Sequence, residues 1–231
     1  MTAQGKICVS ISAADARAVA EAVRPLASLV DVVEVRLDAM RDPDVSGCLE
    51  MISLPLLFTN RPVWEGGAFS GTEEERLEPL LTAARSGAAY VDLELRADAV
   101  LRKRLRAQCA TGSCRLILSW HNFATTPSMA ELQGLVCRME EAGADIGKVV
   151  TTARNVSDVI RVLSLPSAVH RDGFGLSAFC MGEAGRISRF ATLYLGGTMT
   201  YVAPDRHSAT APGQLTARQM AQLVTGFSHA D

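Results

Sequence analysis

Short apolar segments alternate with longer segments of helical periodicity eight times along the 231 residues, and this alternation restricts the fold more than any other feature. Strands that alternate with helices without a break predict a parallel sheet. Eight units of roughly thirty residues each match a closed (β/α)8 barrel in number and in length. The predicted strands are 7–12, 32–37, 56–59, 90–95, 116–120, 146–150, 174–179 and 198–202, and the predicted helices are 13–24, 44–51, 73–85, 98–107, 128–142, 157–163, 186–193 and 216–225.

An open, doubly wound sheet is the alternative arrangement of such units. It is weaker here, because Ser12 at the end of the first strand passes directly to Ala13-Ala14-Asp15, without the Gly-x-Gly-x-x-Gly fingerprint of nucleotide-binding folds. No Pro-, Gly- or Ser-rich linker divides the chain. We therefore predict an α/β fold in which residues 1–231 form a single (β/α)8 TIM-barrel domain.

The charge balance excludes several classes of protein. A formal net charge of -2 gives no electrostatic reason to expect a nucleic-acid partner. Charged residues interrupt every apolar run before it reaches the about 20 residues that a membrane span needs, and the N-terminus lacks the pattern of a signal peptide. We expect a cytoplasmic chain with no membrane partner. Cys109 and Cys114 are the only close pair of cysteines and have no histidine nearby, so we expect no metal site.

Lys148 is chemically unusual for its position. The chain has only three lysines against twenty arginines, and this one stands among Ile146, Val149 and Val150 in a predicted strand. An amine, unlike a guanidinium, can lose its proton and attack a carbonyl to form a Schiff base. The alternative is a lysine at a strand end that reaches solvent or pairs with a carboxylate.

Two other predicted strands carry charges on one face only. Glu34, Arg36 and Asp38 alternate with apolar residues in the second strand, and Asp92 and Glu94 do so in the fourth. The apolar faces should meet the helices, so the charged faces should point into the barrel, where an unpaired ion is costly. These side chains must then bind a ligand or pair with one another, for example Arg36 with Glu94 in a structural network.

His121 ends the fifth predicted strand, on the same face as Ile117 and Ser119. Histidine can take and return a proton near neutral pH. The strand of Lys148 is its neighbour, and adjacent strands lie about 4.8 Å apart, so a base would stand beside a potential imine, as proton abstraction next to a carbonyl requires. The alternative is a hydrogen-bonded structural histidine. The other histidines, 170, 207 and 229, fall in segments that we expect to be solvated.

Two arginines and one loop complete the set of candidates. Arg61 follows the third strand in the loop 60–67 and is placed to bind an anion or a hydroxyl group. Arg189 falls in the first turn of the helix after the seventh strand, a position that favours a carboxylate ligand. A solvated arginine is the alternative for each. The polar loop 208–214 follows the eighth strand and could close over a ligand.

With its candidate residues in this order along the sequence, the chain resembles the type I 3-dehydroquinate dehydratases, which are Schiff-base enzymes of the shikimate pathway. The resemblance covers essentially the whole length, and six segments in the right order make it specific. They are Glu-Val-Arg-Leu-Asp (34–38), Arg-Pro-Val-Trp-Glu-Gly-Gly (61–67), Ser-Trp-His-Asn-Phe (119–123), Asp-Ile-Gly-Lys (145–148), Met-Gly-x-x-Gly-x-x-Ser-Arg (181–189) and Ala-Pro-Gly-Gln (211–214).

The resemblance implies a syn elimination that converts 3-dehydroquinate to 3-dehydroshikimate and water. Lys148 would form the imine, His121 would act as general base and acid, and Glu65 would orient His121. The implied substrate-binding residues are Arg189, Thr210 and Gln214 at the carboxylate and nearby hydroxyl, and Glu34, Arg36 and Arg61 at the ring hydroxyls. The family usually has serine at the position of Thr210, which keeps the hydroxyl and adds a methyl group.

The resemblance also implies a homodimer, a small-molecule substrate and no metal or nucleotide cofactor. Two other functions stay open at this point. A class I aldolase would need a lysine at a strand end too, together with a phosphate-binding glycine loop after the seventh or eighth strand. A non-catalytic barrel that binds a small acid would use the buried ions as structure.

Overall fold

The computed structural model describes residues 5–169 and 173–228, and eight parallel strands form one sheet within them. Their order is β7-β6-β5-β4-β3-β2-β1-β8. The strands are β1 (Lys6–Ile11), β2 (Val32–Arg36), β3 (Leu56–Thr59), β4 (Tyr90–Glu94), β5 (Arg115–His121), β6 (Ile146–Thr152), β7 (Gly175–Met181) and β8 (Met199–Val202). Each falls where the sequence predicts a strand, with ends that differ by at most two residues.

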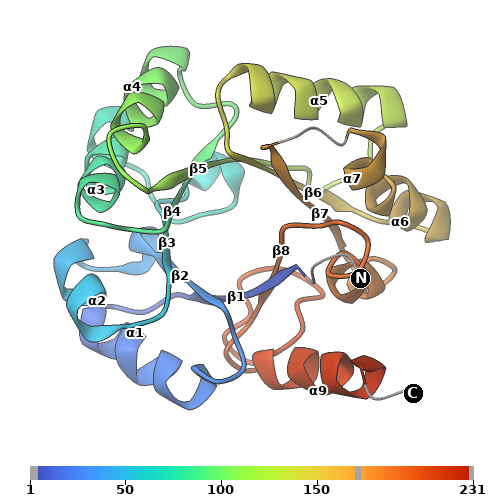
Figure 1. Ribbon diagram of the computed structural model, residues 1–231, viewed down its shortest axis with the longest axis horizontal. Helices are drawn as coiled ribbons and strands as arrows, with labels where there is room; N and C mark the ends of the chain where they lie inside the picture. The colour runs from blue at the N-terminus through green and yellow to red at the C-terminus, as the bar shows by residue number, and fades with distance from the viewer. Residues whose placement is uncertain (1–4, 170–172, 229–231) are drawn as a thin grey trace.

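The sheet curls into a nearly closed barrel, which confirms the predicted fold (Figure 1). The gap lies between β7 and β8, where the residues form no regular ladder. Two contacts bridge it: the backbone N–H of Thr198 donates to the carbonyl oxygen of Leu176 at 2.8 Å, and the N–H of Met199 donates to the hydroxyl of Ser177 at 3.1 Å. β8 is therefore fixed to both of its neighbours.

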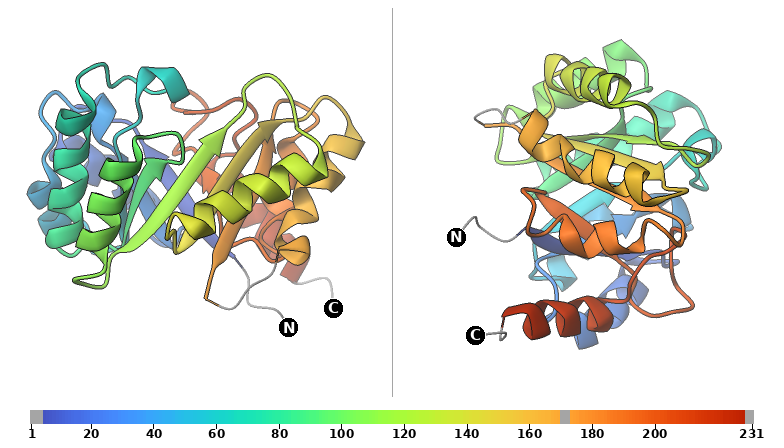
Figure 2. Two further views of the ribbon diagram at one scale, coloured as in Figure 1. Left: turned by 90° about the horizontal axis from the view of Figure 1, so that it is seen from above. Right: turned by 90° about the vertical axis from the view of Figure 1, so that its right-hand side faces the viewer.

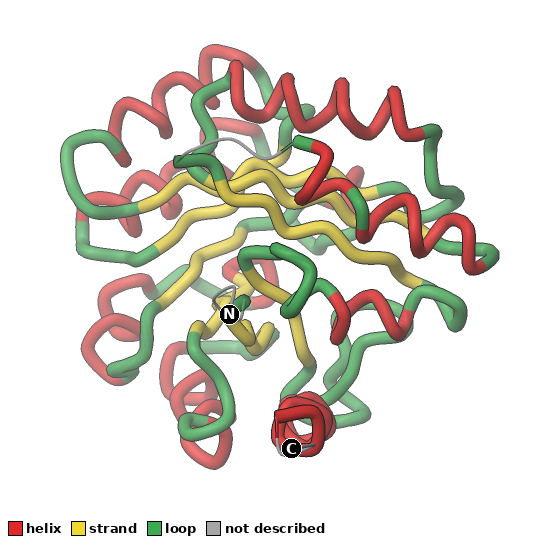
Figure 3. Tube along the Cα trace, turned by 45° about the vertical axis from the view of Figure 1, so that its right-hand side comes forward, coloured by secondary structure: helices red, strands yellow, loops and turns green. Residues whose placement is uncertain are grey.

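Helices surround the strands on the outside (Figures 1 and 3). The α-helices are α1 (Ala16–Val23), α2 (Val45–Met51), α3 (Glu73–Arg85), α4 (Ala99–Cys109), α5 (Met129–Glu141), α6 (Val156–Leu163), α7 (Leu165–Ala168), α8 (Arg186–Ala191) and α9 (Ala217–Ser228), and the 3₁₀ helices are η1 (Arg24–Leu26), η2 (Leu37–Ala39) and η3 (Val63–Glu65). The short helix α7 was not predicted. The first predicted helix begins three residues late because the Asp15 side chain caps it, accepting from the N–H of Ala18.

Strict alternation along the strands divides the interior into two cores. The outward side chains, such as Val33 and Val35 of β2, pack against the helices. Inward residues fill the barrel itself, and its N-terminal half is closed by apolar side chains. This apolar plug comprises Cys8, Val32, Leu57, Tyr90, Ile117, Ile146 and Met199. Polar and charged inward residues therefore gather in the C-terminal half.

The loop after β3 and the loop after β8 meet at the C-terminal end of the barrel (Figure 2, left, teal and orange-red). Gly66 and Gly67 of the first loop and Ser208 to Thr210 of the second line the same hollow. This end of a parallel barrel is where ligand sites form.

None of the helices within the described residues is long and apolar enough to cross a bilayer. The prediction of one domain extends over residues that the structure does not describe and stays a prediction. His170 and His229 also lie outside the described ranges, and His207 is exposed.

Gly147 allows a tight contact between β6 and α5, and its replacement tests that packing. A Cβ there would lie 2.9 Å from Cζ of Phe174 and 3.1 Å from Sδ of Met139. Gly147→Ala should lower the free energy of unfolding by about 1–3 kcal/mol through overpacking. In Gly134→Ala, within α5, the nearest atom to the new Cβ is 3.6 Å away, and the change should raise stability by about 0.5–1 kcal/mol. Urea unfolding measures the change in the free energy of unfolding for both variants. If the two changes have the same sign, this account of the packing is wrong.

Candidate active site

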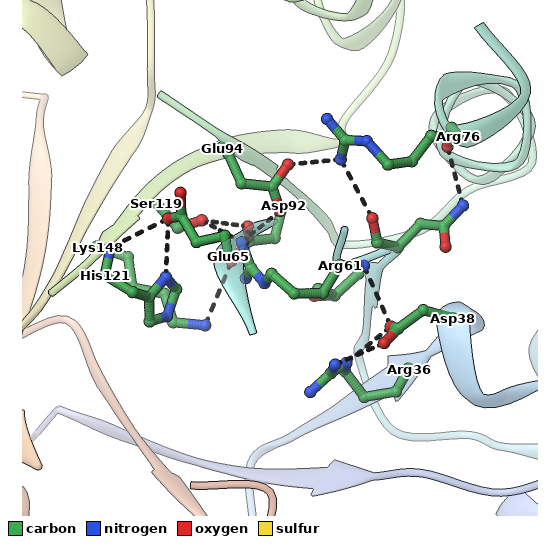
Figure 4. Close-up of polar contacts among 12 residues, drawn as sticks. Arg36, Asp38, Arg61, Glu65, Arg76, Asp92, Glu94, Ser119, His121 and Lys148 are labelled. Atoms are coloured by element: carbon green, nitrogen blue, oxygen red, sulfur yellow. Dashed lines mark hydrogen bonds and ion pairs between the residues drawn. The ribbon is translucent and has the colours of Figure 1, made fainter. Parts of the chain in front are cut away.

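Lys148 lies inside the barrel at 5 % exposure, so the alternative in which it reaches solvent is wrong. Its Nζ is 3.3 Å from Oδ2 of Asp92 (Figure 4). The same atom is 3.5 Å from Oε1 of Glu34. The ring centroid of Tyr201 is 3.7 Å away. The amine is thus held between two carboxylates and an aromatic face.

Both carboxylates near Lys148 stay ionised. Burial acts to raise the pKa of Asp92, but the nearby charges of Arg61 and Lys148 outweigh it and hold the pKa well below its usual value. The pKa of Glu34 is lowered in the same way, against burial, by Lys148 and Arg36. A buried anion is tolerated only when cations of this kind compensate it.

Arg61 joins two strands in a buried ion-pair network. Its Nη2 is 3.0 Å from Asp92, and its Nη1 is 2.5 Å from Glu94 and 2.7 Å from the hydroxyl of Ser119 (Figure 4). Arg76, from α3, reaches the other oxygen of Glu94 and the backbone carbonyl of Asn60. Arg61 lines the pocket, but most of its donors are bound to carboxylates of the protein.

The predicted pairing of Arg36 with Glu94 is wrong. Arg36 instead forms a bidentate pair with Asp38, at 2.8 and 2.6 Å, because η2 turns Asp38 back toward the end of β2. Asp38 also accepts from the backbone N–H groups of Arg61 and Ala68. The carboxylate therefore fixes both ends of the loop that follows β3.

His121 and Glu65 form a hydrogen-bonded pair at the mouth of the barrel. One oxygen of Glu65 lies 3.0 Å from the backbone nitrogen of His121 and 3.0 Å from its Nδ1. In the neutral imidazole that donates from Nδ1, the other nitrogen, Nε2, is left as an acceptor. The second carboxylate oxygen of Glu65 is buried, and none of the described residues forms a hydrogen bond with it.

The environment keeps this imidazole neutral. Burial lowers the pKa of His121 well below its ordinary value, and the charges of Arg61 and Lys148 lower it further. Burial also raises the pKa of Glu65 to about 7, although Arg61 acts against it. At neutral pH the imidazole of His121 is therefore neutral and able to accept a proton.

Gly66 shapes the loop that carries Glu65. It ends η3 with a φ of 78°, in the left-handed region, and a Cβ there would lie 2.6 Å from Cζ of Phe123. The ring of Phe123 stacks on the imidazole of His121, with centroids 6.1 Å apart. Only glycine permits this approach of the loop to the end of β5.

Arg189 is 1 % exposed, and among the described residues no carboxylate pairs with it. Its guanidinium has only long contacts to the carbonyls of Tyr201 and Pro212, at 3.5 and 3.4 Å, and its Nε has no partner. Burial lowers its pKa to about 10. Since a buried cation without an anion is costly, this side chain is suited to receive an anionic ligand.

The loop after β8 contributes Thr210 and Gln214. The side-chain oxygen of Gln214 accepts from the N–H of Thr210 at 2.9 Å and from its hydroxyl at 3.3 Å. The Thr210 hydroxyl also lies 3.4 Å from that of Ser10 on β1. The extra methyl of threonine therefore does not prevent the hydroxyl from reaching the pocket.

One pocket brings all of the predicted site residues together. Its lining includes Glu34, Arg36, Arg61, Glu65, His121, Lys148, Arg189, Thr210 and Gln214. Their catalytic and binding roles stay predictions. Among the described residues, no cluster of three or more His, Cys, Asp or Glu side chains is arranged to hold a metal ion.

Comparison with known proteins identifies the family. The sequence model of the family described as type I 3-dehydroquinase matches residues 7–230. The chain belongs to this family. A 3-dehydroquinate dehydratase of Desulfotalea psychrophila is 46% identical over 222 residues, which are 96% of this chain and 98% of that protein. Another, from Methanothermobacter thermautotrophicus, is 37% identical over 215 residues, 91% of each chain.

Solved structures agree with this assignment. The 3-dehydroquinate dehydratase of Geobacillus kaustophilus superposes with a TM-score of 0.86 at 27% sequence identity, over 98% of this chain and 93% of that one. As a type I 3-dehydroquinase, the chain is an enzyme of the hydro-lyase class.

The sequence analysis of this type I 3-dehydroquinase missed two pocket residues, Phe179 and Tyr201. Each occupies an inward position of a strand, and alternation from neighbouring residues could have placed both inside the barrel. Their residue types gave no signal, since phenylalanine and tyrosine are common in any strand.

Glu65→Gln should make the protein more stable at high pH. The pKa of Glu65 is raised from 4.5 to about 7, so this carboxyl group binds its proton more tightly in the folded chain than in the unfolded chain. The free energy of unfolding of the wild type therefore falls as the pH rises from 4.5 through 7. Because glutamine is always neutral, the free energy of unfolding of Glu65→Gln should exceed that of wild type by about 2–3 kcal/mol at pH 8 and by little at pH 4.5. Urea unfolding at the two pH values measures this difference.

A surface glutamate offers the opposite case. The pKa of Glu75 is lowered by hydrogen bonds from Thr72 in a helix cap. Glu75→Gln should lower stability by an amount that stays constant from pH 5 to pH 8. A Glu65→Gln variant whose difference from wild type is equally constant would refute the raised pKa.

Proposed function

We propose that this chain converts 3-dehydroquinate to 3-dehydroshikimate and water by syn elimination through an imine at Lys148. The observation that carries the proposal is the combination of a buried amine and a neutral imidazole on adjacent strands, in a pocket whose buried Arg189 has no carboxylate partner. Relatives that are named 3-dehydroquinate dehydratases and match along nearly the whole chain support the choice of substrate.

The first step forms the iminium. The amine of Lys148 attacks the substrate ketone, and the overall change is R–NH3⁺ + O=C → R–NH⁺=C + H2O. One ammonium proton must leave before the attack, and the carboxylates of Asp92 and Glu34 are the nearest acceptors, at 3.3 and 3.5 Å. The positive charge stays on the nitrogen and makes the neighbouring C–H acidic.

His121 then carries the proton through the elimination. Its free Nε2 takes the proton from the carbon next to the iminium, which gives a neutral enamine and an imidazolium that Glu65 stabilises. The enamine nitrogen then donates its electron pair to re-form the C=N bond, and the ring C–O bond breaks. His121 gives its proton to the departing hydroxyl, which leaves as water. Hydrolysis of the conjugated iminium frees the product and restores Lys148.

The substrate is held at its two ends. The guanidinium of Arg189 binds the carboxylate, and Gln214 and Thr210 bind the carboxylate and the hydroxyl near it. Glu34 and Arg36 face the ring hydroxyls. Arg61 contributes chiefly by fixing Asp92 and Glu94, since its guanidinium already pairs with both.

The two other functions lose support. An aldolase for phosphorylated substrates needs free backbone N–H groups in a glycine loop, but after β7 the N–H of Gly185 donates to the carbonyl of Gly182, and that of Arg186 to Glu183. A purely structural role for the ions does not explain the unpaired Arg189. The homodimer that the resemblance implies and the cytoplasmic location that the sequence pattern predicts both stay predictions.

Reduction with borohydride in the presence of 3-dehydroquinate tests the imine. The reagent should convert the iminium to a stable secondary amine and inactivate the enzyme, with the added mass on the peptide of Lys148. Lys6 and Lys103, which are exposed, serve as internal controls and should stay unmodified. Absence of an adduct on Lys148 in an active preparation would rule out the mechanism.

His121→Ala separates the imine from the elimination in the same experiment. The variant should still yield the adduct, at least in part, because Lys148 is retained, whereas dehydration should fall by at least about 100-fold. Retention of normal turnover by this variant would show that another group is the base.

Arg189→Ala should raise KM by about 100-fold, because the substrate carboxylate would be left unpaired in the pocket. Arg186→Ala is the matched control: this arginine begins the same helix, is half exposed and pairs only weakly with Glu183 at 3.9 Å. Its KM should equal that of wild type. Steady-state kinetics with 3-dehydroquinate measures both, and similar KM values for the two variants would remove Arg189 from the carboxylate site.

A further inference from the structure

Two aromatic rings lie beneath two of the cations that line the pocket. Tyr201 on β8 and Phe179 on β7 are both buried and line the pocket. Their ring centroids are 5.9 Å apart and the ring planes meet at 41°. We call this pair the aromatic floor. The sequence analysis assigned it no role.

Each ring of the aromatic floor carries one cation on its face. Nζ of Lys148 is 3.7 Å from the centroid of Tyr201, and Cζ of Arg189 is 4.9 Å from the centroid of Phe179. Both distances are within the about 6 Å at which a cation is attracted to the negative face of a ring, and the attraction is strongest where water is excluded.

We propose that the aromatic floor positions the two cations for the reaction: Tyr201 stabilises the iminium that forms at Lys148, and Phe179 holds Arg189 for the substrate carboxylate. Contact between the rings fixes the spacing of the two cations. The pocket thereby selects small acids whose ketone and carboxylate match that spacing. This inference rests on the proposed function.

Tyr201 is needed because imine formation weakens the other contacts of the amine. The ammonium of Lys148 has three N–H donors for Asp92 and Glu34, but the iminium keeps one. Hydrogen bonds to the carboxylates are therefore lost when the C=N bond forms. The attraction between the charge and the ring face needs no N–H, so it persists from the ammonium to the iminium. It therefore becomes a larger share of the interactions that stabilise the charge.

The ring of Tyr201, and not its hydroxyl, performs this role. The hydroxyl is buried without a partner, and burial raises its pKa well above the usual value, so it stays a neutral phenol. Phenylalanine would keep the face and remove an unsatisfied polar group. This makes Tyr201→Phe a conservative rescue of the ring that Tyr201→Leu removes.

Phe179 acts on binding, because no carboxylate within the described part of the chain holds Arg189 in place. Without the ring the guanidinium would be free to adopt other orientations, and the carboxylate would bind less tightly. The iminium chemistry at Lys148 would be affected less. The two rings should therefore give different kinetic signatures, which a general packing role would not produce.

The test compares Tyr201→Leu, Tyr201→Phe and Phe179→Leu with wild type, through kcat, KM and the yield of the borohydride adduct with 3-dehydroquinate. Tyr90→Leu is the matched control. Tyr90 is also an inward tyrosine of the barrel with a lysine near its face, Lys6 at 5.8 Å, but it belongs to the apolar plug away from the pocket. Thermal unfolding confirms that each variant is folded, and Tyr201→Met provides a second ring-free variant if leucine prevents folding.

Tyr201→Leu should lower kcat by about 30-fold and reduce the adduct yield, while KM changes less than threefold. Tyr201→Phe should recover most of the lost kcat. Phe179→Leu should raise KM by about tenfold with a smaller effect on kcat. Tyr90→Leu should resemble wild type in both constants.

The inference is overturned if Tyr201→Leu keeps the wild-type kcat, if Tyr201→Phe is as impaired as Tyr201→Leu, or if the Tyr201 and Phe179 variants change kcat and KM in the same proportion. Failure of the proposed function has a different outcome: wild type itself would then give no adduct at Lys148. A wild-type adduct together with an unaffected Tyr201→Leu variant rejects the aromatic floor alone.

Discussion

Charge buried inside the barrel is the constraint on which the rest of the structure depends. Taking a carboxylate or a guanidinium out of water costs several kcal/mol even in real proteins, so each such group needs a partner. Arg61 is the partner of both Asp92 and Glu94, and Arg76, which also pairs with Glu94, connects this network to α3. Because these pairs join the loop after β3 to β4 and β5, the groups that secure the charges also fix the mouth of the pocket.

The unpaired groups stand out against this background. Around Lys148 the charges are balanced. Among the described residues, by contrast, buried Arg189 has no carboxylate partner and one buried oxygen of Glu65 has no hydrogen-bond partner. A protein interior seldom tolerates such groups unless something else completes them. We infer that the buried groups without partners contact the ligand, and that the paired groups hold the pocket in shape.

Much of this could be predicted from the sequence. The eight strands follow from alternation alone, and the inward position of Glu34, Asp92 and Lys148 follows from the period of two in each strand. Pairing could not be predicted, because several charges share the inward faces and local backbone turns decide which of them meet: η2 follows Arg36 directly and places Asp38 against its guanidinium. The aromatic floor was missed because proximity across β7 and β8 depends on how the barrel closes.

The apolar plug determines where substrate and product can enter and leave the barrel. Since side chains such as Leu57 and Ile117 fill the N-terminal half of the barrel, the pocket lies at the C-terminal end, among the strand ends and the loops that follow them. Substrate and product therefore use the same end of the barrel, and a product molecule that stays bound excludes the next substrate.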